Sequence, residues 1–392
     1  MKKNIILGLI LSLVMILGAC SQSQSLNNVS NNESANNSEG NSGDAVKIGV
    51  VLPLTGPAAL YGEQALEGGQ LAAKLINEEG GILDGKKIEL LIEDDQAKPE
   101  LGVNKFKKLI EVDKVDAITG GVNSSVNMAT KDVAKNRLIN VVTISKAPDI
   151  MADRDPYRFR LNSTNDMDGS AFHKFMAEQL KPKTVAVIVE NTDYGQAELK
   201  ALQENWSFDG APEIVATEFF ELTETDFTNP LTKLKAANAE ALYVVGAAIE
   251  INSAIFKQAY QLGFNDTMKL LAPGNINTKV VELAGEGSEG VISADLYQNS
   301  VDNEMNKKFV EAFEMEFKRK PEKMEALGFE AIWFLAKAMD EAGSKNDYDT
   351  ISSILEEKEW ESPRGTLNFE NGQALGEVIP LMIKDGEIVP HQ

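Results

Sequence analysis

The chain has 392 residues and a formal net charge of −22, with 60 acidic against 38 basic side chains. A surface this acidic repels phosphate backbones and anionic lipid, so the composition excludes nucleic acid as an expected partner. A single cysteine excludes a disulfide framework within the chain.

The first predicted element is an N-terminal targeting segment. Lys2 and Lys3 precede an apolar run from Ile5 to Leu17, which is too short to span a membrane comfortably. The run leads into Gly18-Ala19-Cys20 and resembles a lipobox, whose cysteine receives a diacylglycerol and becomes the new N-terminus. The alternative is a plain secretory signal with an incidental cysteine. We expect residues 1–20 to be a lipoprotein signal peptide, with Cys20 lipidated into a stable anchor.

Residues 21–44 are rich in Ser, Asn, Gln and Gly and contain almost no large apolar side chain. Such a segment cannot bury enough surface to offset the entropy of ordering it. The composition predicts a flexible tether with a mean reach of roughly 25–30 Å.

From Ala45 onward, β-branched runs alternate with helical patterns in two successive series. The first series predicts strands at 46–52, 87–93, 115–119 and 139–145. The second predicts helices at 172–180, 196–206, 227–237 and 249–262 and strands at 184–190, 213–220, 241–246 and 269–271. This alternation favours parallel sheets with helices on both faces, in two doubly wound α/β lobes.

Later elements must complete these lobes. The pattern predicts helices at 304–319, 325–342 and 348–357 and strand-like pieces at 365–368 and 377–384. We expect 45–165 plus 298–372 to form lobe 1, and 166–297 plus 373–392 to form lobe 2.

Ligands of open α/β sheets bind at loops beyond the carboxyl ends of strands. After the strand at 115–119, Gly120-Gly121 precedes a predicted helix that starts at Ser124-Ser125. Two glycines permit close backbone approach, and the hydroxyls and free N–H groups of a helix start suit a carboxylate. The alternative is ordinary capping of the helix by Ser124 or Asn123. Tyr61 and Tyr194 follow the first strands of the two series. Each tyrosine either lines the ligand cleft or packs within its loop.

Three other patterns are rejected. Gly285–Gly290 has the spacing of a dinucleotide fingerprint, but it follows a helix and precedes a strand, the reverse of the required order. Glu93–Asp95 lacks nearby histidine, so we interpret it as a solvated strand end and expect no metal site and no cofactor. His173 and His391 are the only histidines, and no Gly-x-Ser-x-Gly elbow is present, so we expect no enzyme activity.

The segment Val46–Pro57, followed by Tyr61-Gly62, resembles the opening of the leucine/isoleucine/valine-binding proteins. Asn77–Ile82, Asp193–Gly195 and Gly328–Ala331 resemble further blocks of that family, in the same order. The resemblance runs from Val46 nearly to the C-terminus. It implies a type I periplasmic-binding-protein fold: two lobes joined by a three-crossover hinge, closing on a ligand in the cleft.

The resemblance also implies candidate ligand-binding residues. Ser124 stands where the family binds the ligand carboxylate, with Ser125 beside it. Tyr61 and Tyr194 stand where aromatics line the cleft, and Phe329 where the family often has Tyr. Ser145 and Lys146 replace a loop that usually reads Pro-Ala-Ala-Thr, and Asn275 lies in a late loop of the second lobe.

One departure from the family concerns the ligand's ammonium. Amino-acid binders pair it with a Glu, whereas this chain has Gly274 at the matching position. Burying an ammonium without a carboxylate is costly. Either Glu190, Asp193 or Glu250 substitutes from another loop, or the ligand is a carboxylate or amide without an α-amino group.

The resemblance implies a monomeric, lipid-anchored receptor on the outer face of the cell membrane. Such a receptor delivers a small polar ligand, a branched-chain amino acid or a related carboxylate or amide, to the permease and ATPase subunits of an ABC importer. A ligand-sensing module of the same fold and a secreted hydrolase are the alternatives.

Overall fold

The computed structural model describes residues 45–206 and 211–391, and residues 43–392 form a compact unit of their own. The expected signal peptide, Cys20 and the tether at 21–44 lie outside the described residues. Within the described part of the chain, no helix combines the length and apolar character needed to span a bilayer.

The first sheet has eight strands in the order β11-β12-β13-β5-β4-β3-β1-β2. Neighbours among β1 to β5 run parallel, and β13 joins β5 in parallel, whereas β11, β12 and β13 pair antiparallel. The strands are β1 Val46–Leu52, β2 Ile88–Asp94, β3 Ala117–Gly120, β4 Ile139–Val142, β5 Arg158–Arg160, β11 Trp360–Ser362, β12 Gly365–Glu370 and β13 Gln373–Leu375.

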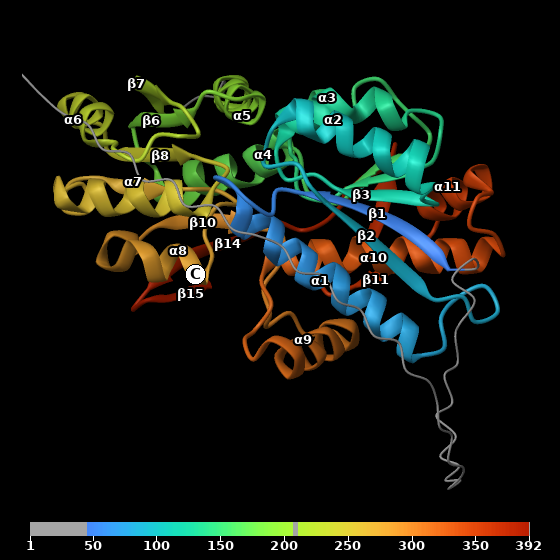
Figure 1. Ribbon diagram of the computed structural model, residues 1–392. Helices are drawn as coiled ribbons and strands as arrows, with labels where there is room; N and C mark the ends of the chain where they lie inside the picture. The colour runs from blue at the N-terminus through green and yellow to red at the C-terminus, as the bar shows by residue number, and fades with distance from the viewer. Residues whose placement is uncertain (1–44, 207–210, 392) are drawn as a thin grey trace, which may run out of the picture. The chain divides into compact units, whose positions relative to one another are not determined.

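Helices cover both faces of this sheet, as the continuous apolar run of β1 predicts. Val46, Ile48 and Val50 share a core with helices α1 (Ala59–Glu78) and α10 (Lys323–Ala342). Val51 packs on the other face, in a cluster to which the α2 and α3 segments contribute. These are α2 (Pro99–Lys108), continued by the π-helix η1 (Leu109–Asp113), and α3 (Ser124–Ala134). Figure 1 shows the two helix pairs on opposite sides of the strands.

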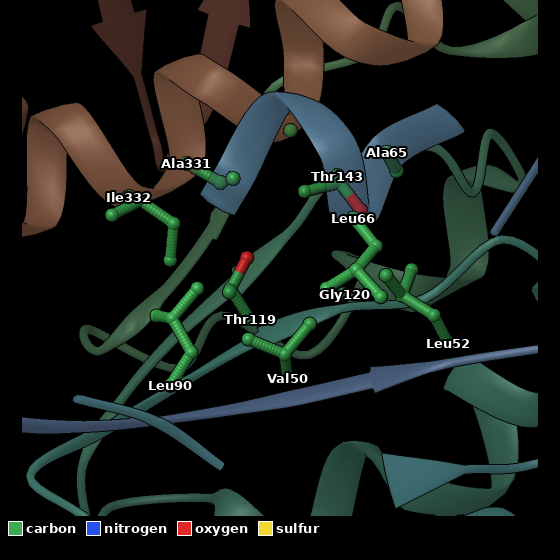
Figure 2. Close-up of a pocket in the computed structure, with 12 residues that line it drawn as sticks. Val50, Leu52, Ala65, Leu66, Leu90, Thr119, Gly120, Thr143, Ala331 and Ile332 are labelled. Carbon is green, nitrogen blue, oxygen red and sulfur yellow. The ribbon is translucent and has the colours of Figure 1, made fainter. Parts of the chain in front are cut away.

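Helices α1 and α10 lie unusually close together. A Cβ atom built on Gly328 would lie 1.9 Å from the Ala65 carbonyl oxygen, so only glycine permits this approach. Between the two helices and the sheet remains a cavity of about 10 Å³, lined by apolar side chains and the hydroxyls of Thr119 and Thr143 (Figure 2). That volume admits one water at most, so the cavity is a packing gap in the core.

The second sheet has seven strands in the order β15-β14-β10-β9-β8-β6-β7. Neighbours among β6 to β10 run parallel, whereas β14 pairs antiparallel with both β10 and β15. The strands are β6 Thr184–Glu190, β7 Glu213–Phe220, β8 Ala241–Val245, β9 Lys269–Leu271, β10 Ile292–Asp295, β14 Ile379–Lys384 and β15 Glu387–Pro390.

Alternate side chains of β6 point to opposite faces of this sheet. Val185 and Val187 pack in a cluster with side chains of α4 and α5, whereas Ala186 packs with those of α6 and α7. The helices are α4 Asn165–Phe175 with its π-helical continuation η3 Met176–Leu180, α5 Asp193–Asn205, α6 Thr228–Ala236, α7 Ile249–Gln261, and α8 Thr278–Ala284 followed by the 3-10 turn η4 Gly285–Ser288. The 3-10 turn η2 Pro148–Ile150 packs beside α3 and β4 of the first sheet. Both sheets are therefore doubly covered, as expected.

The chain passes between the two sheets three times: after β5, after β10 and after β13. Between the second and third passages, α9 (Glu304–Phe317), α10 and α11 (Tyr348–Glu357) pack with the first sheet and its helices. The expected lobe boundary at 372/373 separates β13 from the sheet with which it pairs.

The structure adds elements that the sequence pattern did not predict. Strands β5, β11, β13 and β15 have only three or four residues, too few to show an alternation. Helix α5 begins at Asp193, three residues before the expected start, because the Thr192 hydroxyl accepts a hydrogen bond from the Gly195 amide and caps the helix. Tyr194 therefore belongs to the first turn of a helix.

Candidate functional site

A cavity of about 30 Å³ lies where the strand ends of both sheets meet. Every lining residue either follows the carboxyl end of a parallel strand or begins α10, in agreement with the general position of ligands in open α/β sheets. The lining residues are Tyr61, Val122, Ser124, Ile144, Lys146, Asn162, Tyr194, Ala247, Gly274, Asn275, Lys323 and Met324.

The start of α3 forms one wall of this cavity. Asn123 occupies the cap position, but its side chain makes no capping hydrogen bond. Ser124 is buried, and its Oγ accepts a hydrogen bond from the Ala147 amide at 3.3 Å. The first amides of a helix lack intrahelical acceptors and carry a partial positive charge, so this wall suits an anion.

Buried polar contacts fix the two loops beside that helix. The Ser145 hydroxyl lies 3.2 and 3.1 Å from the carbonyl oxygens of Gly121 and Val122. It accepts a hydrogen bond from the side-chain amide of Asn127 at 2.6 Å. Arg160, at the end of β5, donates to the carbonyl oxygens of Lys146 and Ala147 at 3.2 and 2.8 Å. These contacts hold the backbone that presents Lys146.

Two tyrosines contribute hydroxyls to the cavity. The Tyr61 hydroxyl is buried and has no hydrogen-bond partner among the described residues. The Tyr194 hydroxyl accepts a hydrogen bond from the Asn275 side-chain amide at 2.9 Å. Burial raises the pKa of both tyrosines well above the ordinary value, although the Lys146 cation lowers that of Tyr194. Both hydroxyls therefore stay protonated and able to donate.

Two lysines also line the cavity. Lys146 is buried, with its Nζ 6.0 Å from the centre of the Tyr194 ring. Lys323, the first residue of α10, donates from Nζ to the Gly274 carbonyl oxygen at 2.6 Å and lies 2.8 Å from Asp295 Oδ1. The cavity lining includes no Asp or Glu among the described residues.

Gly274 adopts a backbone conformation that favours glycine, with φ of 72°. Its amide donates to the Ala294 carbonyl oxygen at 2.7 Å and lies 3.1 Å from Ser293 Oγ. A glutamate at this position would be strained.

None of the three proposed substitutes for the family's glutamate lines the cavity. Glu190 is buried, and its carboxylate accepts hydrogen bonds from the Thr192 hydroxyl and the Ala247 amide, both at 2.5 Å. Burial raises the pKa of Glu190 to about 7. Asp193 lines a different cavity, and the Glu250 side chain is exposed.

The structure brings five of the eight candidate ligand-binding residues together around the cavity: Tyr61, Ser124, Lys146, Tyr194 and Asn275. Ser125 instead accepts a hydrogen bond from the Asp193 amide at 3.4 Å, and Ser145 supports the loop described above. Phe329 packs in the core, with its ring centre 4.8 Å from that of Phe309 and 5.4 Å from that of Trp333.

Besides Gly274, six lining residues were not among the candidates from the sequence: Val122, Ile144, Asn162, Ala247, Lys323 and Met324. Asn162 and Ala247 follow strand ends but carry no distinctive pattern. Lys323 could have been noticed in the sequence, because a cation at the first position of a helix opposes the helix dipole. Such an unfavourable position suggests that the lysine has a role other than stabilising the helix.

The acidic and histidine patterns noted in the sequence have other surroundings in the structure. No group of three or more His, Cys, Asp or Glu side chains in the described ranges is placed to hold a metal ion. Glu93 instead pairs with Lys105 and Lys108, and Asp94 accepts hydrogen bonds from Thr55 and Leu54. His173 is buried against Trp206 and Tyr243, away from the cavity.

The family model described as periplasmic binding protein matches residues 45–387. The chain belongs to this family. The members of this family are non-enzymatic solute-binding proteins, and the observed α/β architecture with two mainly parallel sheets is the type I periplasmic-binding-protein fold.

Three similar proteins place this binding protein among its relatives. The leucine-, isoleucine-, valine-, threonine- and alanine-binding protein of Pseudomonas aeruginosa is 29% identical over 333 residues, which cover 83% of this chain and 86% of that protein. A leucine-binding protein of Thermotoga maritima superposes with a TM-score of 0.82 at 28% identity, covering 89% of this chain and 98% of the other. A solute-binding protein from Rhodopseudomonas palustris, in complex with 3,4-dihydroxybenzoic acid, has a TM-score of 0.80 at 26% identity, covering 88% and 95%.

Proposed function

We propose that this periplasmic binding protein is the lipid-anchored receptor of an ABC importer. It captures a small polar solute in the cavity between the strand ends of its two sheets and delivers it to the permease and ATPase subunits. The observation that carries the proposal is the cavity itself, where an uncapped helix start, two tyrosine hydroxyls and two lysines converge from both sheets.

The ligand's carboxylate binds at the start of α3. There it receives hydrogen bonds from the Ser124 hydroxyl and from backbone amides of the first turn. Tyr61, Tyr194 and Asn275 close over the rest of the ligand, and Ser125 bridges to α5 at the rim. The ligand is a branched-chain amino acid or a related carboxylate or amide, in keeping with the ligands named for the relatives from Pseudomonas aeruginosa and Rhodopseudomonas palustris.

Binding requires the two lobes to move. The cavity of about 30 Å³ has room for about two waters, less than any such solute needs. The three segments that pass between the sheets serve as the hinge. Opening separates Ser125 from Asp193 and Lys323 from Asp295, and closing on the ligand restores these contacts.

The test is a thermal-shift screen of residues 43–392 against amino acids, their amides and amine-free organic acids. A ligand at about 100 times its Kd stabilises the folded state by about 2.7 kcal/mol and raises the midpoint measurably. Ser124→Asp places a negative charge against the ligand carboxylate and should abolish the shift, whereas Ser124→Ala keeps the backbone amides and should retain part of it. A panel without any shift would contradict a receptor for these solutes.

A further inference from the structure

Lys323 places an ammonium group of the protein where an amino-acid ligand would need acceptors for its own ammonium. Its Nζ bridges the Gly274 carbonyl oxygen at 2.6 Å and Asp295 Oδ1 at 2.8 Å, and its side chain is only 8% exposed. Gly274 is the position at which the resemblance places the glutamate that pairs with a ligand's ammonium. This part of the cavity wall is therefore formed by the ammonium of Lys323, which is paired with Asp295.

Helix stability does not explain this lysine. A cation at the N-terminus of the 20-residue helix α10 opposes the helix dipole, and burying an ion pair is costly in desolvation. The cap of α10 is supplied by its neighbours, since the side chains of Glu322 and Glu325 form a reciprocal capping box. What Lys323 adds is a cation at the cavity wall, with two of its three N–H donors already bound.

The other residues that line the cavity are also unsuited to a ligand ammonium. Lys146 supplies a second cation, and no Asp or Glu lines the cavity among the described residues. Gly274 has φ of 72°, so the loop is built without the glutamate that an amino-acid ligand would require. A second ammonium placed there would lie beside that of Lys323 and would find the Gly274 carbonyl oxygen and Asp295 Oδ1 already bound by Lys323.

We propose that the cavity selects small organic acids that lack an ammonium group, such as 2-oxo acids and aromatic carboxylates, and that Lys323 excludes α-amino acids. The ligand carboxylate binds at the start of α3, and an oxo or hydroxyl oxygen accepts the third N–H of Lys323. This inference rests on the proposed receptor function and specifies its ligand class.

The experiment is isothermal titration calorimetry of residues 43–392 with matched pairs that differ only at the second carbon. Leucine is compared with 4-methyl-2-oxopentanoate, and phenylalanine with phenylpyruvate; 3,4-dihydroxybenzoate is added as an aromatic acid. In at least one pair, the oxo acid should bind about 100-fold tighter than the amino acid, because like charges juxtaposed in a buried site are strongly unfavourable. Equal or tighter binding of the amino acid would overturn the inference and leave the receptor function standing. If neither acids nor amino acids bind, both proposals fail.

Substitutions of Lys323 test whether this residue causes the preference for oxo acids over amino acids. Lys323→Ala removes the cation that contacts the Gly274 carbonyl oxygen and Asp295. It should narrow the preference for the oxo acid to less than about 10-fold, because the amino acid is no longer excluded. Lys320→Ala removes an exposed cation three residues away and should leave the preference intact. Lys323→Gln keeps a donor toward Gly274 without the charge, which covers the case that Lys323→Ala does not fold. A preference unchanged in both Lys323 variants would overturn the role of this residue.

Discussion

Two buried ionisable sites of this binding protein show opposite ways of burying a titratable group. Glu330 and Arg364 form a fully buried ion pair with several contacts between 2.6 and 3.1 Å, which ties α10 to the turn between β11 and β12. His173 is the contrasting case. Both of its ring nitrogens lack partners among the described residues, and burial lowers its pKa to about 4. The folded protein therefore keeps this imidazole neutral.

The acid sensitivity contributed by His173 follows from that shift. The unfolded chain binds a proton near pH 6.5, whereas the folded protein does so only near pH 4. The contribution is fully present above pH 6.5 and is lost as the pH falls toward 4, by about 3 kcal/mol. Urea unfolding at pH 7 and pH 4 should show that His173→Phe reduces the stability difference between the two pH values by about this amount.

The pH dependence must be compared between the variant and the wild type, because other buried groups also titrate in this range. Burial raises the pKa of Asp95 to about 6 and that of Glu190 to about 7, so these carboxyls oppose the trend and the wild-type slope alone is not diagnostic. His391→Asn, which changes the other histidine, serves as the control. An identical pH dependence in His173→Phe and the wild type would show that the imidazole titrates normally.

At the scale of single residues, the sequence identified the parts of the site that follow strand ends in a recognisable pattern. Tyr61, Ser124 and Tyr194 fall in this class. Lys323 does not, because its place at the cavity depends on how α10 returns to the strand ends after a long excursion in sequence. Phe329 shows the converse: it lies in the same helix, five residues after Met324, but its side chain packs in the core.

At the scale of elements, apolar strands were predictable, even the three-residue β9 (Lys269–Leu271), whereas short strands without an apolar pattern were not. The predicted bounds of β1, β6 and β7 agree with the structure because each is a run of at least seven residues with clear apolar character. Strand β5 consists of Arg158, Phe159 and Arg160, and its two arginines are fully buried. A three-residue segment with two charged side chains does not look like a buried strand in the sequence. The carbonyl oxygens that accept hydrogen bonds from these arginines belong to other segments of the chain, so the burial of the arginines was not predictable locally.

The contact between α1 and α10 gives a prediction at this scale. Alanine is the better helix former by about 1 kcal/mol, so Gly328→Ala would stabilise an isolated helix. In this protein the new Cβ would meet the Ala65 carbonyl oxygen, and the helices would have to separate. We expect a net loss of at least about 1–3 kcal/mol in the free energy of unfolding, measured by urea denaturation.

Gly69→Ala is the matched control for that substitution. Its new Cβ would meet only the Ile332 side chain at 3.3 Å, which can move, and the Gly328 carbonyl oxygen at 3.4 Å. The change in stability should therefore be much smaller than for Gly328→Ala. If both variants were equally stable, close backbone approach would not be the reason for glycine at 328.

At the scale of the whole molecule, the chain passes between the two sheets three times, and the proposed lipid anchor lies at the N-terminus. An acyl chain on Cys20 would keep the receptor beside its permease, while the tether would let the compact unit turn toward it. Neither feature lies in the described residues, so both depend on the sequence motif.

Lipidation can be tested by metabolic labelling with an alkyne fatty acid. The wild-type protein should incorporate the label, and Cys20→Ala should abolish it, because no other cysteine can receive the diacylglycerol. Ser21→Ala keeps the thiol and serves as the control. Undiminished labelling of Cys20→Ala would rule out the lipobox.

Strand β13 has a consequence for the order in which this protein can fold. It pairs with β5 through Gln373 and Arg160, and β14 and β15 complete the second sheet only after residue 378. A chain still being synthesised therefore lacks β13 until residue 375 has emerged, and it lacks β14 and β15 until residue 390 has emerged. Domains generally fold as units from the N-terminus, but here neither lobe is complete early. Each lobe therefore needs strands from late in the sequence before its sheet is complete, so the two sheets depend on the same final stretch of the described residues.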